Sequence, residues 1–112
     1  MAKRSRYYKL NAKGEPEPCD AFEGTQLLTQ IEGRCILKQR TTNGFFVTTV
    51  FTVQDTNWFE DGPPWLFHTY VYGPNRFYHL AAKYTCRQDA MQGHQSLVAT
   101  IQLLGVPDSP SF

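Results

Sequence analysis

Residues 45–73 read FFVTTVFTVQDTNWFEDGPPWLFHTYVYG, and they contain two runs of β-branched and aromatic side chains separated by a polar loop. Such side chains fit a pleated sheet and lose rotamer freedom in a helix. The runs at residues 45–53 and 65–72 therefore predict two strands. The second strand must begin after Pro63 and Pro64, because proline cannot donate a hydrogen bond to a neighbouring strand.

The alternation of side chains along both runs predicts an apolar face and an opposite face rich in polar-tipped aromatic rings. The apolar face is the expected core and comprises Phe45, Val47, Thr49, Phe51 and Val53 of the first run with Trp65, Phe67, Thr69 and Val71 of the second. The opposite face of the second run comprises Leu66, His68, Tyr70 and Tyr72.

The dipeptide Asn43-Gly44 joins the first run to an expected strand that precedes it. Asn-Gly is typical of a two-residue type I′ hairpin, because both central residues of that turn need positive φ. This turn would place Arg40 opposite Val47, and it would put both Arg40 and Lys38 on the expected core face. Three explanations stay open: the face is half open near the hairpin, the long side chains reach back to water, or a bulge shifts the register.

Shorter elements are expected before this hairpin. Residues 7–10 predict a short strand, and the acid-proline segment at residues 15–18 predicts an extended chain. Asp20 is a typical N-cap, and Glu23 three residues later completes a capping box. We expect the helix that begins there to end at Gly33.

After the central runs, residues 76–84 predict a fourth strand, and Thr85 is the expected cap of a second helix. Gly105 and Pro107 are expected to end that helix. Its apolar positions at helical spacing are Ala90, His94, Leu97, Val98, Ile101 and Leu104. The pattern predicts an α+β fold, with an antiparallel sheet of about four strands and one or two helices packed on one face. We expect one domain over residues 1–112, with a basic arm at residues 1–6 and a loose tail at residues 106–112.

Composition limits the classes of function. The formal net charge of the 112-residue chain is +1, so no global charge points to nucleic acid. The sequence contains no apolar run near the roughly 20 residues that span a bilayer, and its N-terminus lacks the apolar segment of a signal peptide. Its three cysteines are widely spaced without a CxxC pair, which predicts neither a zinc site nor a disulfide framework. We expect a cytoplasmic protein with no cofactor and no membrane contact.

No pattern of titratable residues predicts an active site. His68, His79 and His94 lack the spacing of ligands on one helix. The simpler interpretation is that His68 is a surface residue of its strand and that His94 belongs to the core stripe with a satisfied hydrogen bond. The carboxylates of the central loop could hold a hard cation, but their spacing is unlike that of a calcium loop. We therefore predict no catalytic residue, no metal ligand and no enzymatic activity.

Two kinds of binding surface are expected instead. Aromatic rings with a charged rim are typical of protein interfaces. For a protein partner the candidate residues are Trp58, Phe59, Glu60, Asp61, Tyr70 and Tyr72. Basic residues interleaved with aromatic rings are what binding of single-stranded nucleic acid requires. For this alternative the candidate phosphate contacts are Arg4, Arg6, Lys9, Lys38 and Arg40.

The central strands and the last helix together resemble a family of small phage and prophage proteins of unknown function. The matching residues are Thr49-Val50-Phe51, Asp55, Gly62-Pro63-Pro64, Leu66-Phe67, Thr69, Val71, Tyr84-Thr85, Ala90 and Gly93-His94. The family has an Asp-His pair where this chain has Asp55-Thr56, and a glutamate where this chain has His68. The resemblance implies a phage or mobile-element origin and supplies no reaction.

The leading hypothesis from the sequence is a non-catalytic phage protein that binds and blocks a host macromolecule in the host cytoplasm. Inhibition of a host defence system is one concrete form of such a blockade. The alternatives are an accessory protein that binds nucleic acid or a nucleotide, and a metal-dependent hydrolase using Asp55, His68 and His94. A homodimer is also compatible with an exposed edge strand.

Overall fold

The computed structural model describes residues 6–30, 32–57, 62–74 and 78–104. Its main unit is an antiparallel sheet of four strands in chain order. These strands are β3 (Cys35–Arg40), β4 (Phe46–Phe51), β5 (Phe67–Tyr72) and β6 (Tyr78–Tyr84). The remaining elements are the hairpin of β1 (Tyr7–Leu10) and β2 (Pro16–Cys19), helix α1 (Ala21–Leu28), the 3-10 turn Glu32–Arg34 and helix α2 (Arg87–Leu104). The predicted α+β class is confirmed.

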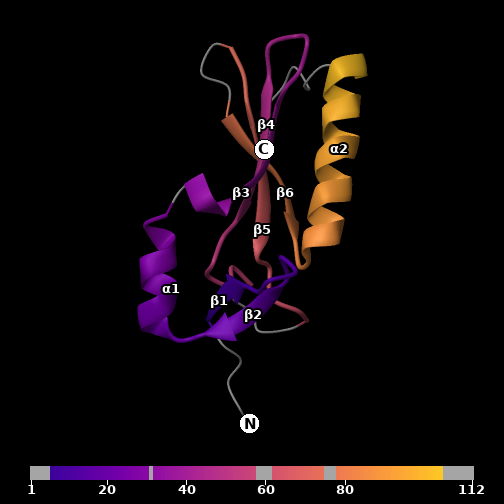
Figure 1. Cartoon of the computed structure of the whole chain (residues 1–112). Helices are drawn as coiled ribbons and strands as arrows, with labels where there is room; N and C mark the ends of the chain where they lie inside the picture. Colours follow the sequence, from indigo (N-terminus) through magenta and orange to yellow (C-terminus); the bar gives the residue numbers. More distant parts are fainter. Residues whose placement is uncertain (1–5, 31, 58–61, 75–77, 105–112) are drawn as a thin grey trace.

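The two helices occupy different parts of the molecule. Helix α2 lies along one face of the sheet, whereas α1 lies beside the β1–β2 hairpin at the lower end of Figure 1. Val98 and Ile101 of α2 pack against Val47 and Val71 of the central strands. One face of the sheet is thus covered by α2, as predicted. No helix in the described part of the chain is long and apolar enough to cross a bilayer.

Burial confirms the predicted core face within β4 and β5, but the expectation for Trp65 is wrong. Trp65 is 38% exposed, whereas Leu66, expected on the opposite face, is 1% exposed. The reason is that β5 begins only at Phe67, so the alternation of a strand does not extend to residues 65 and 66. Val47, Thr49 and Phe67 are completely buried on the side of α2. A second group of core residues joins the sheet to the small hairpin through Tyr8, Phe51, Val53, Leu66, Phe67 and Ala90. The expectation for Leu104 is wrong, because this side chain is 82% exposed in the last turn of α2.

The β3–β4 hairpin differs from the predicted type I′ turn by one residue. Arg40 pairs with Phe46 instead of Val47, and Thr41 donates its backbone N–H to the Phe45 carbonyl at 2.7 Å. Gly44 has a φ of +92°. Asn43 lacks the positive φ that a type I′ turn also needs, because Val53 is the only described residue besides glycine with a positive φ. The loop is therefore a three-residue turn that ends in a glycine bulge. Because a one-residue shift moves every side chain to the other face, Lys38 and Arg40 lie away from the core.

Helix α1 starts as predicted and ends early. The Asp20 carboxylate accepts the Glu23 N–H at 2.8 Å, which confirms the N-cap. The Glu23 carboxylate accepts a hydrogen bond from Lys9 at 3.3 Å instead of closing the expected capping box. The helix ends at Leu28 rather than at Gly33, because the Thr29 hydroxyl donates to the Gln26 carbonyl and closes the last turn.

Helix α2 begins one residue later than predicted. The carbonyl of Cys86, not that of Thr85, accepts the first helical N–H, from Ala90 at 3.1 Å. The Cys86 thiol accepts the Asp89 N–H at 3.5 Å, so cysteine takes the place of the usual oxygen cap. The predicted end at Gly105 and Pro107 lies outside the described residues.

Candidate functional site

The face of the sheet turned away from α2 carries the candidate site, and we call it the open face. Strand pairing aligns Arg40, Phe46, Tyr72 and Tyr78 in one row across this face. A second row contains Lys38, Thr48 and Tyr70, and a third contains His68 and Lys83. All four strands therefore contribute side chains to one surface.

Three tyrosines form the centre of the open face. The rings of Tyr70 and Tyr78 stack with centroids 5.6 Å apart and planes at 26°. The ring of Tyr72 lies 5.2 Å from that of Tyr78. Tyr78 is 58% exposed and Tyr72 is 40% exposed, so this aromatic cluster is open to solvent. Burial raises the pKa of both Tyr70 and Tyr72, which keeps their hydroxyl groups protonated.

Cations surround the tyrosines. The Arg40 guanidinium lies 5.7 Å from the centre of the Phe46 ring, and the Lys83 ammonium lies 5.1 Å from the centre of the Trp65 ring. Lys38 and Phe46 line a hollow of about 340 Å³ together with Thr48 and Tyr72. None of the four strands contains aspartate or glutamate. The charge that these strands contribute to the open face is consequently positive.

His68 lies at one end of the open face and is 7% exposed. Its ring nitrogens lie 3.1 Å from the Thr56 hydroxyl and 3.1 Å from the Tyr70 hydroxyl. Burial, followed by the nearby Lys83 charge, lowers the pKa of His68 from 6.5 to about 4. The imidazole is therefore neutral near pH 7 and anchors the Tyr70 hydroxyl, instead of being the surface residue that the sequence suggested.

His94 lies on the opposite side of the sheet and is completely buried. Its Nε2 lies 2.8 Å from Gln39 Oε1, and its Nδ1 lies 2.7 Å from the Thr49 hydroxyl, which meets the Thr69 hydroxyl at 2.6 Å. Because the Gln39 oxygen only accepts, Nε2 carries the proton and Nδ1 accepts from Thr49. Burial lowers the pKa of His94, which fits this neutral form. The predicted structural role of His94, with a satisfied hydrogen bond, is confirmed.

The residues of the hydrolase hypothesis are not brought together. His68 is paired with Val50, whereas His94 contacts Thr49, the neighbouring residue on the other face. The Asp55 carboxylate accepts the backbone N–H groups of Asn57 at 2.8 Å and Trp65 at 3.1 Å, so it holds the loop closed. The described residues contain no group of histidine, cysteine and carboxylate side chains that could hold a metal ion.

The other predicted binding residues are placed as follows. Lys9 faces carboxylates of the small hairpin and α1, with Glu23 at 3.3 Å and Glu17 at 3.8 Å, and takes no part in the open face. Glu23 is the main reason why the pKa of Lys9 is raised. The Arg6 carbonyl accepts the Asp55 N–H at 2.9 Å. Arg4 and the loop residues Trp58, Phe59, Glu60 and Asp61 lie outside the described residues.

Of the residues predicted to bind, Tyr70, Tyr72, Lys38 and Arg40 therefore share one surface. Tyr70 and Tyr72 were predicted to bind a protein, whereas Lys38 and Arg40 were predicted to bind phosphate. Strand pairing places all four on the same face of the sheet. The sequence-based sets missed Phe46, Thr48, Tyr78 and Lys83. Alternation placed Phe46 and Thr48 on the outer face of their strand, but only the pairing of β5 with β6 brings Tyr78 against Tyr72.

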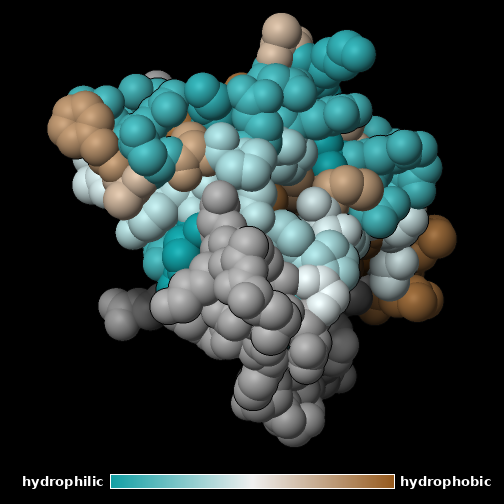
Figure 2. Space-filling model, turned by 90° about the horizontal axis from the view of Figure 1, so that it is seen from below, coloured by the Kyte–Doolittle hydropathy of each residue, from teal (hydrophilic) through white to brown (hydrophobic). Residues whose placement is uncertain are grey.

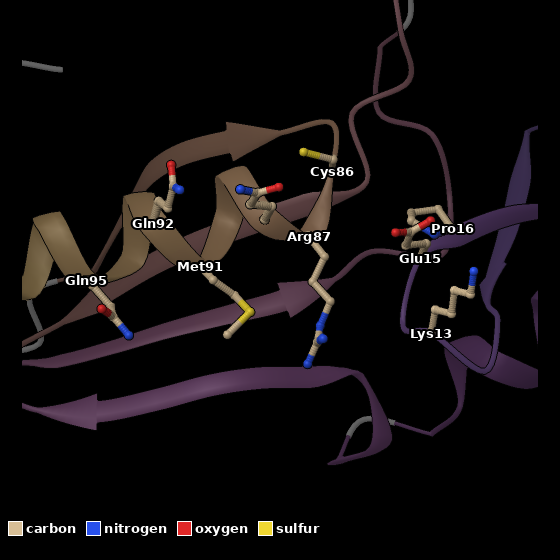
Figure 3. Close-up of a pocket in the computed structure, with 9 residues that line it drawn as sticks. Lys13, Glu15, Pro16, Cys86, Arg87, Met91, Gln92 and Gln95 are labelled. Carbon is tan, nitrogen blue, oxygen red and sulfur yellow. The ribbon is translucent and has the colours of Figure 1, made fainter.

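A cleft of about 580 Å³ lies elsewhere, between the start of α2 and the turn that joins β1 to β2. Arg87 and Met91 extend from one side of the helix, and Lys13 and Glu15 come from the turn (Figure 3). Cys86 also lines this cleft, and no histidine is among the lining residues. The Arg87 side chain lies over Gly14, where an added Cβ would approach its Nη1 to 3.0 Å. This arrangement places the turn of the hairpin against the start of α2.

The lower end of the molecule is mostly hydrophilic. Seen from below, the described surface shows hydrophobic side chains in small separate groups rather than in one patch (Figure 2). Comparisons of the chain with protein-family models, with curated proteins and with solved structures find no match.

Proposed function

We propose that the protein binds single-stranded nucleic acid across the open face of its sheet. The observation that carries this proposal is the cluster of Tyr70, Tyr72 and Tyr78 on a sheet whose strands β3 and β6 contain cations and whose four strands contain no carboxylates. Stacking of bases on exposed aromatic rings and pairing of phosphates with cations are the two interactions on which such binding depends.

The shape of the site supports a single strand rather than a duplex. The tyrosine rings belong to β5 and β6 in the middle of a sheet surface, and no described helix projects from that surface toward a groove. A four-stranded sheet with exposed aromatic rings is also the platform on which one widespread RNA-binding module stacks two or three bases. This is an analogy of surface chemistry and not of family.

Salt dependence is the direct test. Each phosphate contact to a single strand contributes a slope of about −0.7 to log Kobs against log salt. Contacts from Lys38, Arg40 and Lys83 would give a slope near −2, which is roughly a 20-fold loss of affinity between about 50 and 200 mM salt. Fluorescence anisotropy of a labelled ten-nucleotide single strand measures this slope.

A matched pair of lysine variants sharpens the test. Lys38→Gln should reduce the magnitude of the slope by about 0.7, because it removes one phosphate contact. Lys9→Gln removes the same charge at a site occupied by Glu17 and Glu23, so the slope should stay at the wild-type value. Equal effects of the two variants, or no binding by the wild type at low salt, would refute the proposal.

A blockade of a host protein remains the second candidate, because tyrosine and arginine are enriched at protein interfaces. Its specific support is the exposed group of Phe46, Tyr72 and Tyr78, which lies in one row with Arg40. Affinity capture from bacterial lysate, with and without nuclease treatment, separates the two candidates. One protein held in stoichiometric amount at high salt favours blockade, whereas capture that nuclease abolishes favours nucleic acid.

A further inference from the structure

The hollow on the open face lies beside one unusual hydroxyl group. Phe46 and Tyr72 are directly paired across β4 and β5, and Lys38 and Thr48 are directly paired across β3 and β4. These four side chains line the hollow of about 340 Å³. Its lining residues thus combine two aromatic rings, one ammonium group and the hydroxyls of Thr48 and Tyr72.

The Thr48 hydroxyl is buried and has no hydrogen-bond partner among the described residues. By contrast, the hydroxyls of Thr49 and Thr52, which follow it in the sequence, are both hydrogen-bonded. A buried polar atom without a partner destabilises a folded protein, so each such atom requires an explanation. A ligand that supplies the missing hydrogen bond is one explanation with a testable consequence.

We infer that this hollow is a seat for one nucleobase of the bound strand. This inference rests on the proposed function and specifies which part of the nucleic acid the open face recognises. The base lies against the rings of Phe46 and Tyr72, and its polar edge exchanges a hydrogen bond with Thr48 Oγ1. The phosphate that follows it pairs with Lys38.

The chemistry of the lining favours a base over other planar ligands. The positive charge of Lys38 and Arg40 selects an anionic chain, and no carboxylate on the strands opposes it. A threonine hydroxyl both donates and accepts, so it can bond to the edge of any of the bases. Because the Thr48 hydroxyl is covered in the free protein, binding of a base requires a movement of the side chains around it, and the long flexible side chain of Lys38 lies directly opposite.

The decisive variant is Thr48→Val, which has the same shape and lacks the hydroxyl. Because it removes an unpartnered buried atom, it should raise the melting temperature by about 4 °C. Because it also removes the hydrogen bond to the base, it should weaken binding of the decamer dT10 by about fivefold. Thr48→Ser keeps the hydroxyl and should bind dT10 with an affinity close to the wild-type value.

An abasic ten-nucleotide strand with the same phosphates is the matched probe. It should bind the wild type at least about tenfold more weakly than dT10, because the stacking interactions are lost. Its affinity should be the same for the wild type and for Thr48→Val. The melting temperatures of both proteins are measured without nucleic acid.

The outcomes separate the seat from the proposed function. If dT10 binds the wild type with the expected salt slope but Thr48→Val binds equally well, the base seat is overturned and the proposed function stands. The seat is also overturned if Thr48→Val weakens dT10 and the abasic strand by the same factor. If neither strand binds the wild type at low salt, both the function and the seat are refuted.

Discussion

Gly93, in the middle of α2, is the position where the packing of helix on sheet is most sensitive to one added carbon. A Cβ at Gly93 would lie 2.7 Å from Cε1 of the Tyr84 ring, and still closer to its Cζ and Oη. Tyr84 is partly buried and packs against the core group that includes Phe67. The ring of Tyr84 therefore fills the space that any side chain at residue 93 would need.

Two opposing effects set the magnitude of Gly93→Ala. Alanine stabilises a helix interior by about 1 kcal/mol relative to glycine. An ordinary carbon–carbon contact is about 3.5 Å or more, so the outer end of the Tyr84 ring must move by more than about 1 Å into its neighbours. Overpacking of this kind costs about 1–3 kcal/mol. We expect a net loss of about 1 kcal/mol in the free energy of unfolding.

A double-mutant cycle with Tyr84→Leu tests this explanation by a change of sign. Leucine lacks the three atoms that the new methyl group would meet, and it keeps the branch near the backbone. In the Tyr84→Leu background, Gly93→Ala should therefore stabilise the protein by about 1 kcal/mol, as helix propensity requires. Urea denaturation followed by circular dichroism measures all four proteins.

The exposed Ala99 on the same helix provides the control. Ala99→Gly should lower the free energy of unfolding by about 1 kcal/mol whether or not Tyr84 is replaced. Steric overlap with the Tyr84 ring is refuted if Gly93→Ala stabilises the wild-type protein, or if its effect is the same with tyrosine and with leucine at residue 84.

Two further predictions concern the polar groups on either side of the sheet. The pKa of His68 is lowered from 6.5 to about 4, so as the pH falls His68 is protonated in the unfolded chain before it is protonated in the folded protein. The stability that this residue contributes above pH 6.5 is therefore lost between pH 6.5 and pH 4. This loss amounts to roughly 3 kcal/mol in the free energy of unfolding. Urea denaturation of the wild type and of His68→Gln at pH 7 and pH 4 measures it. The assignment is contradicted if the difference in stability between the two proteins is the same at both pH values. Thr49→Val removes the hydroxyl that joins Thr69 to His94 and leaves two buried polar groups without a partner, so it should lower the free energy of unfolding by about 2 kcal/mol or more. Thr48→Val on the other face should have the opposite sign, and thermal melts of the two variants compare them directly.

The elements of the fold could be predicted because they depend on local patterns. Side-chain alternation in residues 45–53 and 65–72 identified the central strands and their core face, as the burial of Val47 and Phe67 shows. The short-range signal of Asp20 identified the start of α1. The end of α1 escaped prediction, because Gly33 looked like a stop and the closing hydrogen bond comes from Thr29. The presence of glycine at residue 24, inside α1, is explained only by packing, since a Cβ there would lie 2.5 Å from the Tyr7 ring.

The residues of the resemblance acquire structural reasons in the same way. The Tyr84 ring fills the space that a side chain at Gly93 would need. His94 is the centre of a buried chain of hydrogen bonds. Asp55 closes a loop by accepting two backbone N–H groups. None of these roles follows from spacing along the chain, because each depends on a partner on another element.

Local patterns in the sequence identified the segments that become strands and helices, and the side of β4 and β5 that avoids water. Those properties follow from the chemistry of neighbouring residues. The positions of the charges depend on strand pairing, because Lys38 and Arg40 change faces with the one-residue shift at Gly44. The tertiary structure also decided that Tyr70, Tyr72 and Tyr78 meet as one surface, since register between strands is a long-range property.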